Sequence, residues 1–130
     1  MPHSRTTLDR IFHPQSVAIV GASDNPLKMS YRCVESLAQI GFPGKVFPIN
    51  GRLDSICGYQ VYSSLLDVPG DVDLAVIVVQ ARQVKEALAA AAEKHAAGAV
   101  IITAGFKEIE DAAGAELEAE IRKIADAAGI

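Results

Sequence analysis

The sequence predicts a doubly wound α/β fold, in which helices cover both faces of a mainly parallel β-sheet. Short apolar runs of strand length alternate with helical segments of ten residues or more along the 130 residues. Parallel strands joined by such helices need right-handed crossovers, which place helices on both sides of the sheet. Half of the residues are apolar and 22% are charged, an ordinary globular balance. We therefore expect a single domain over residues 1–130.

The first half of the chain predicts two helices and two strands. A short helix over residues 7–12 begins at Thr7, which can cap it, and ends before Pro14. The run at 17–20 is continuously apolar, as in a strand that is covered on both faces. A longer helix over 28–40 has apolar residues at a period near 3.6 and ends before Gly41, a typical left-handed cap. Residues 45–49 form the second strand.

The second half predicts the rest of the sheet. A turn at 56–59 and a short strand at 60–62 precede a brief helix at 65–68, which Ser63 or Ser64 can cap. The run D-L-A-V-I-V-V at 73–79 is the clearest buried strand. An alanine-rich helix over 81–97 closes at Gly98, a strand follows at 99–103, and a last helix covers 112–128.

The candidate site is the edge of the sheet where the strands end. Ligands of such sheets bind beyond the carboxyl ends of the strands, where the strand order reverses. The loops that reach this edge are Gly21-Ala22-Ser23, Asn50-Gly51-Arg52, Gln80-Ala81 and Ala104-Gly105-Phe106. The first of them runs into a helix near Lys28. A strand, a glycine turn and a helix N-terminus together form the usual phosphate-binding construction.

The residues of these loops narrow the choice of ligand. A dinucleotide site favours G-x-G-x-x-G after the first strand and an acidic residue after the second. Here only Gly21 matches, because Ser23 and Pro26 stand in place of the other glycines. The second strand is followed by Arg52, and a guanidinium suits a phosphate. With Lys28 nearby, the pattern favours a ligand with an extra phosphate, such as NADP or coenzyme A.

Charge and hydropathy argue against other classes of partner. The formal net charge is −4 and no basic stripe is present, so we expect no nucleic-acid partner. No apolar run reaches eighteen residues and no signal peptide is recognisable, so we expect a cytoplasmic protein without a membrane partner. Cys33 and Cys57 lack metal or redox spacing, and the three histidines are scattered. We expect neither a metal site nor catalytic residues.

Five segments, taken in order, resemble the coenzyme A-binding domain of NDP-forming acyl-CoA synthetases, the relatives of the succinyl-CoA synthetase alpha subunit. The segments are G-A-S-x-x-P-x-K, G-F-x-G-K-V-F-P-I-N, I-C-G-Y-Q-V-Y-S-S-L, D-L-A-V-I-V-V and I-I-T-A-G-F-K-E. The resemblance implies a Rossmann-like sheet that binds coenzyme A. It also implies a parent enzyme that makes an acyl-CoA from an acid, coenzyme A and ATP or GTP.

The resemblance assigns roles to the loop residues. It implies that Gly21, Ala22, Ser23 and Lys28 hold the phosphate end, and that Ser30 and Tyr31 line the same loop and helix start. Asn50 and Arg52 would flank the nucleotide, while Val79, Gln80, Ala81, Ala104, Gly105 and Phe106 would frame the path of the pantetheine. The chain departs from the family pattern at Ser30, which is commonly glycine, at Gly51-Arg52, commonly Pro-Lys, and at Gln80, commonly proline.

The resemblance also implies that the chain is the N-terminal part of a longer protein. In the family, a phosphohistidine domain and an ATP-grasp portion follow, so this part alone is not expected to catalyse ligation. Two alternatives remain open. The domain could be the coenzyme A- or acyl-CoA-sensing module of a protein acetyltransferase, or the NADP-binding domain of an oxidoreductase.

Overall fold

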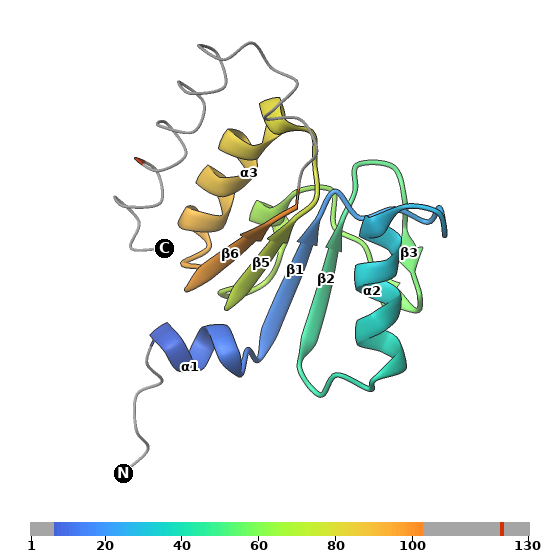
Figure 1. The fold of residues 1–130 in the computed structure, drawn as a ribbon, viewed down its shortest axis with the longest axis horizontal. Helices are drawn as coiled ribbons and strands as arrows, with labels where there is room; N and C mark the ends of the chain where they lie inside the picture. The colour runs from blue at the N-terminus through green and yellow to red at the C-terminus, as the bar shows by residue number, and fades with distance from the viewer. Residues whose placement is uncertain (1–6, 103–122, 124–130) are drawn as a thin grey trace.

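The computed structural model describes residues 7–102 and Lys123, and its centre is a four-stranded parallel sheet (Figure 1). The strand order is β2-β1-β5-β6. A two-stranded antiparallel hairpin, β3-β4, lies outside this sheet. The strands are β1 (Ser16–Val20), β2 (Lys45–Ile49), β3 (Ser55–Ile56), β4 (Tyr59–Gln60), β5 (Leu74–Ile77) and β6 (Gly98–Ile101). The helices are α1 (Thr7–Phe12), α2 (Met29–Gln39), α3 (Ala81–Glu93) and the short 3-10 helix η1 (Leu65–Asp67).

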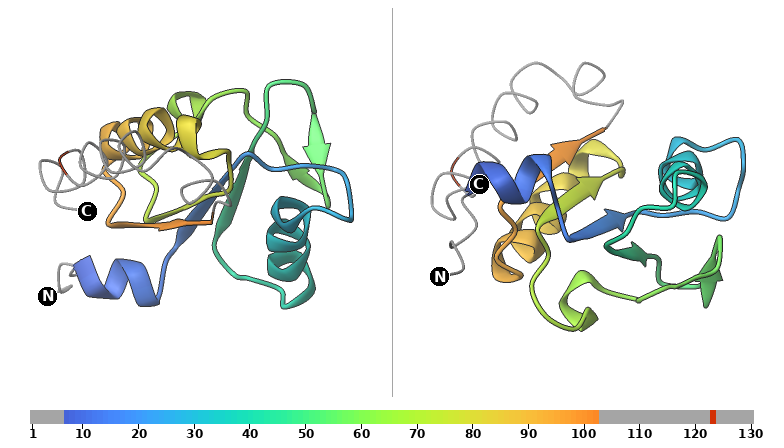
Figure 2. Two further views of the ribbon diagram at one scale, coloured as in Figure 1. Left: turned by 45° about the horizontal axis from the view of Figure 1, so that its top comes forward. Right: turned by 90° about the horizontal axis from the view of Figure 1, so that it is seen from below.

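Helices cover both faces of the sheet, which confirms the predicted doubly wound α/β fold. Successive side chains of β1 point to opposite faces. Ala18 belongs to a buried cluster with Val84 and Leu88 of α3, whereas Val17 and Ile19 belong to a second cluster with Val34 of α2. The two helices accordingly lie on opposite sides of the sheet (Figure 2). The core is thus two apolar layers that the sheet separates.

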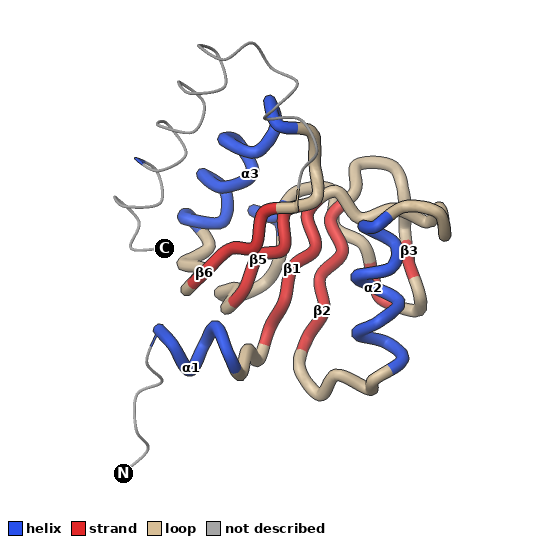
Figure 3. The backbone as a smooth tube through the Cα atoms, viewed as in Figure 1, coloured by secondary structure: helices blue, strands red, loops and turns tan. Residues whose placement is uncertain are grey.

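The strand order reverses between β1 and β5. After β1 the chain passes through α2 to β2 on one side, and it later returns to place β5 on the other side of β1 (Figure 3). Pro48 in β2 is compatible with this arrangement, because β2 is an edge strand and a proline lacks the N–H that a central strand needs. The carboxyl ends of β1 and β5 therefore flank the position at which sheets of this kind bind ligands.

The helix ends agree with the sequence at α2 and differ from it at α3. Gly41, with φ +66°, closes α2 as predicted, since its N–H donates to the Ala38 carbonyl at 3.2 Å. The prediction that α3 reaches residue 97 and closes at Gly98 is wrong. His95, with φ +58°, takes the left-handed position instead, and the Ala96 N–H donates to the Ala91 carbonyl at 3.1 Å.

Gly98 is needed for a different reason. It begins β6, and a Cβ atom there would lie 2.9 Å from Cγ1 of Ile11 in α1. The missing side chain lets α1 approach the amino end of the sheet. The sequence position of Gly98, after a predicted helix, indicated a helix cap. The structure shows instead that Gly98 makes room for the Ile11 side chain of α1.

The remaining elements differ mainly in length. The strand expected at 73–79 is shorter in the structure, where β5 covers Leu74–Ile77. The strand expected at 60–62 corresponds to β4, which covers Tyr59–Gln60. The turn at 56–59 is confirmed at the tip of the hairpin, and Ser64 caps η1 through a bond from the Leu66 N–H at 3.2 Å. The helix expected at 112–128 lies outside the described residues, apart from Lys123. Among the described residues, no helix is long and apolar enough to cross a membrane.

A buried carboxylate fastens α1 to the amino end of the sheet. The Asp73 carboxylate accepts from Nε of Arg10 at 2.7 Å and from the Gln15 N–H at 2.8 Å. The Asp73 N–H donates to the Ser16 hydroxyl at 2.9 Å, while Nη2 of Arg10 reaches the His95 carbonyl at 2.8 Å. Asp73 is 7% exposed, so solvent screens these charge-assisted bonds only weakly.

We predict that Asp73→Ala destabilises the protein by about 2–4 kcal/mol, because the Gln15 N–H and the Arg10 guanidinium, both in part-buried bonds, lose their acceptor. Urea denaturation measures the free energy of unfolding. Asp71→Ala is the matched control, because the Asp71 side chain is exposed. A loss for Asp73→Ala no larger than that of the control would contradict the anchoring role.

Candidate functional site

The turn after β1 is built on a glycine that a larger residue cannot replace. Gly21 has φ +86°, and a Cβ atom there would lie 2.2 Å from the Val78 carbonyl oxygen. Its N–H and that of Ala22 donate to the Ile49 carbonyl at 3.2 and 3.0 Å. The backbone of this turn therefore bonds to the end of β2 and packs against the segment after β5, and any side chain at position 21 would clash with Val78 and Val79.

The Asn50 side chain joins this turn to the loop after β2. Its Nδ2 donates to the Ala22 carbonyl at 2.8 Å, and its Oδ1 accepts from the Arg52 N–H at 2.7 Å and the Leu53 N–H at 3.2 Å. An asparagine amide offers a donor and an acceptor at once, which an aspartate does not. Asn50 thus fixes two loop backbones relative to each other.

A pocket of about 640 Å³ opens beside Gly21, at the carboxyl ends of β1 and β5. Three regions of the chain meet there: the Gly21 turn, the start of α2, and the segment that leads from β5 into α3. Ile102, directly after β6, closes the lining. The lining residues besides Gly21 and Ile102 are Lys28, Met29, Ser30, Val78, Val79, Gln80 and Gln83. The pocket therefore lies at the reversal of the strand order, which is the edge at which the sequence predicts a ligand site.

Positive charge is available at this edge. Lys28 is the N-cap residue of α2 and Arg52 lies in the loop after β2; both are exposed, and neither forms an ion pair within residues 7–102. The N-terminus of α2 adds the partial positive charge of its free N–H groups. The loop before it is pre-shaped, because the Asn25 N–H donates to the Ser23 hydroxyl and the Leu27 N–H donates to Oδ1 of Asn25, both at 3.0 Å.

Tyr31 faces the hairpin and not the pocket. A hydrogen bond with the Cys57 side chain, together with the nearby charges of Cys57 and Glu35, raises the pKa of the Tyr31 phenol. The phenol therefore stays protonated and neutral at physiological pH. Tyr31 packs against the buried cluster that contains Ile56, so its position supports the fold around the hairpin.

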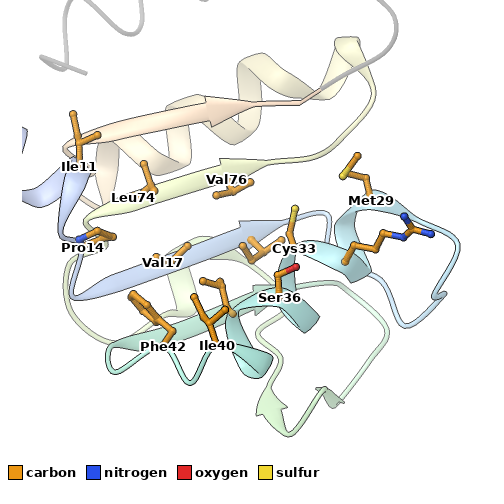
Figure 4. A pocket seen from close by; sticks show the side chains of 13 residues that line it. Ile11, Pro14, Val17, Met29, Cys33, Ser36, Ile40, Phe42, Leu74 and Val76 are labelled. Carbon is orange, nitrogen blue, oxygen red and sulfur yellow. The ribbon is translucent and has the colours of Figure 1, made fainter.

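A second pocket, of about 520 Å³, has a different chemistry. It runs along the sheet face beside α2, and its lining is almost entirely apolar, with Val17, Leu74 and Val76 at its floor (Figure 4). Cys33 lines it, and burial raises the pKa of this thiol, which keeps it protonated. The groove runs along the strands from Ile11 and Pro14 to Met29, and its apolar lining is unsuited to a phosphate. No group of three metal-ligating side chains occurs in the described part of the chain.

The structure distributes the predicted site residues that it describes over four positions. Gly21, Lys28, Ser30, Val79 and Gln80 line the first pocket. Ala22, Ser23, Asn50 and Arg52 belong to the two loops that Asn50 joins, Tyr31 faces the hairpin, and Ala81 begins α3. Ala104, Gly105 and Phe106 lie outside the described residues. Sequence reasoning missed Gln83, although it lies in the first turn of α3, three residues after the N-cap residue Gln80.

We predict that Asn50→Ala destabilises the protein by about 1–3 kcal/mol, because the Ala22 carbonyl and two loop N–H groups lose their partner. Urea denaturation measures the loss, and Gln39→Ala is the control, since the Gln39 amide is exposed and hydrogen-bonds to no described residue. Equal stability of the two variants would show that Asn50 does not hold the loops.

Solved and curated relatives share this fold. The apo structure of a dinucleotide-forming acetyl-coenzyme A synthetase 1 from Ca. Korarchaeum cryptofilum superposes with a TM-score of 0.86 at 38% identity, covering 95% of this chain and 26% of that chain. An ADP-forming acetate–CoA ligase II of Archaeoglobus fulgidus is 43% identical over 120 residues, 92% of this chain and 18% of the relative. An ADP-forming acetate–CoA ligase of Methanocaldococcus jannaschii is 46% identical over 118 residues, 91% of this chain and 16% of the relative.

The chain thus spans between a sixth and about a quarter of the length of these relatives. Residues 15–130 match the model of the CoA binding domain family, and the match includes the Gly21 turn, the start of α2 and the loop after β2. The fold, the pocket at the strand reversal and this match agree, and the chain belongs to the coenzyme A-binding domain family.

Proposed function

We propose that the chain binds coenzyme A across the carboxyl end of its sheet and serves as the coenzyme A-binding domain of an NDP-forming acid–CoA ligase. The observation that carries the proposal is the pocket in which Gly21, Lys28 and Ser30 meet Gln80 at the strand reversal. The phosphates of coenzyme A fit these residues. The turn has no Cβ to obstruct a phosphate, and an uncapped helix N-terminus with a lysine stands beside it.

The parts of coenzyme A can be assigned by their chemistry. Its diphosphate is held at the N-terminus of α2 beside Lys28, where donors and positive charge coincide. Arg52, outside the pocket and tied by its N–H to Asn50, carries the charge for the 3′-phosphate. The pantetheine arm follows Val79, Gln80 and Gln83, whose apolar groups and amides suit its methyl groups and amide bonds. Ala104, Gly105 and Phe106 remain predicted contacts of the same arm.

The proposed role of the domain is to bind and orient. The thiol of coenzyme A is the acyl acceptor when the cofactor is bound. Activation of the acid belongs to the further domains proposed for the parent protein, which carry the phosphohistidine and bind the nucleotide. This role is supported by the ADP-forming ligases among the relatives, whose chains extend far beyond the matched segment.

One observation favours a second candidate. A conserved hypothetical protein of Pyrococcus furiosus, with a TM-score of 0.69 and 31% identity, covers 89% of this chain and is itself covered to 89%. The domain can therefore make up nearly the whole of a short protein. Binding of coenzyme A without ligation, as in a coenzyme A-sensing domain, is the function that we propose for this alternative. The coding sequence around residues 1–130 distinguishes the two, because a ligase requires the phosphohistidine and ATP-grasp domains and a sensor in an acetyltransferase requires an acetyltransferase domain.

We predict that Lys28→Ala and Arg52→Ala each weaken binding of coenzyme A about 10-fold, the effect of losing one charge-assisted hydrogen bond. The melting temperature should change little, because exposed charges contribute under about 1 kcal/mol to folding. Titration calorimetry of the 130-residue chain measures the dissociation constant. Lys45→Ala is the control, because Lys45 is an exposed lysine at the opposite end of the sheet.

A second ligand separates the two charges. With 3′-dephospho-coenzyme A, Arg52→Ala should bind like the unmodified chain, whereas Lys28→Ala should still be weakened. Early unfolding of both variants with unchanged binding would show that the phosphates are held elsewhere. Saturable binding of NADPH, with no binding of coenzyme A, would favour the oxidoreductase alternative.

A further inference from the structure

The first turn of α2 leaves several N–H donors without an acceptor among the described residues. Lys28 is its N-cap residue, and its side chain makes no capping bond. The first bond of the helix runs from the Arg32 N–H to the Lys28 carbonyl at 3.2 Å. The N–H groups of Met29, Ser30 and Tyr31 therefore precede the first intrahelical bond and need other acceptors. A helix N-terminus of this kind attracts anions, but by itself it does not show that one binds.

The Ser30 hydroxyl is an independent sign of a ligand. Ser30 is only 4% exposed and lines the pocket beside Gly21 and Lys28. Its hydroxyl forms no hydrogen bond with any described residue, and it does not bond back to the Pro26 carbonyl, as serines in helices often do. A buried hydroxyl without a partner is unfavourable and rare in native proteins. The partner of this hydroxyl must therefore enter the pocket, either as water in the free protein or as a group of a bound ligand.

The chemistry of that group follows from its neighbours. Around the hydroxyl are a lysine ammonium, the N-terminal end of a helix and a glycine turn that no side chain blocks. All of them favour a negatively charged acceptor. A neutral amide would gain little from the ammonium and from the helix, whereas a phosphate oxygen gains from both.

We propose that the Ser30 hydroxyl donates a hydrogen bond to a phosphate oxygen of the diphosphate of coenzyme A, and so acts as a specificity-determining residue for that part of the ligand. The inference rests on the proposed function and adds to it a contact from this chain's own serine, at a position where glycine is common in the family. The Ser30 side chain occupies space that a glycine would leave open. In return, it contributes a hydrogen-bond donor that a glycine lacks.

Stability and affinity should respond to Ser30→Ala with opposite signs. The substitution removes a buried hydroxyl that bonds to none of the described residues, so the melting temperature should stay unchanged or rise. The same substitution removes a donor to a charged group in the complex, so the dissociation constant of coenzyme A should increase about 10-fold. A hydroxyl with a merely structural role would lower the melting temperature instead.

Titration calorimetry of the 130-residue chain with coenzyme A and with pantetheine, which has no phosphate, tests the inference. Ser30→Ala should weaken binding of coenzyme A and leave any binding of pantetheine unchanged. Ser36→Ala is the matched control, an exposed serine on the same helix that does not line this pocket. Ser30→Gly should bind like Ser30→Ala or more weakly, since it also lacks the hydroxyl.

Three results would overturn the inference. If Ser30→Ala binds coenzyme A within a factor of about two of the unmodified chain, or binds it more tightly, the hydroxyl is not a ligand contact and the proposed function stands. If pantetheine binding falls by the same factor, the hydroxyl contacts the arm and not the diphosphate. If the unmodified chain does not bind coenzyme A, the proposed function fails and the inference fails with it.

Discussion

The close approach of Gly21 to the Val78 carbonyl is the constraint on which the carboxyl edge of the sheet depends. At 2.2 Å from that oxygen, no Cβ atom can be accommodated at position 21. The chain can therefore turn sharply out of β1 while it stays against β5, and its N–H groups reach the Ile49 carbonyl of β2. The same lack of a side chain leaves one wall of the pocket as bare backbone.

The two ends of the sheet are stabilised by different means. At the amino end, a buried carboxylate, Asp73, gathers Arg10 and the backbone of Gln15, so that charge is used for folding. At the carboxyl end, the neutral amide of Asn50 holds the loops together, and the charges of Lys28 and Arg52 have no partner among the described residues. At the carboxyl end of the sheet, neutral groups hold the loops together, so the charged side chains can interact with a ligand. This arrangement suits an anionic ligand.

Much of the fold follows from local patterns. The continuous apolar runs, the 3.6-residue period of α2 and the left-handed Gly41 are short-range features, and each was confirmed within one or two residues. The family was also recognisable from the sequence. Five motif segments in the same order identify a family far more specifically than a single glycine motif does. The predictions that failed were those in which a local signal has two interpretations. Gly98 beside a helix end indicated a cap, whereas the packing of Ile11 decides its role.

The sequence by itself determined the α/β class and the alternation of strands with helices, and it predicted the edge of the sheet at which we propose that coenzyme A binds. Only the tertiary structure decided which residues meet there. Ser30 and Tyr31 are neighbours in the chain, yet a helix turns successive side chains by roughly 100°, so that one lines the pocket and the other faces the hairpin. Asn50 and Ala22 are 28 residues apart, and their bond exists only because β1 and β2 pair side by side.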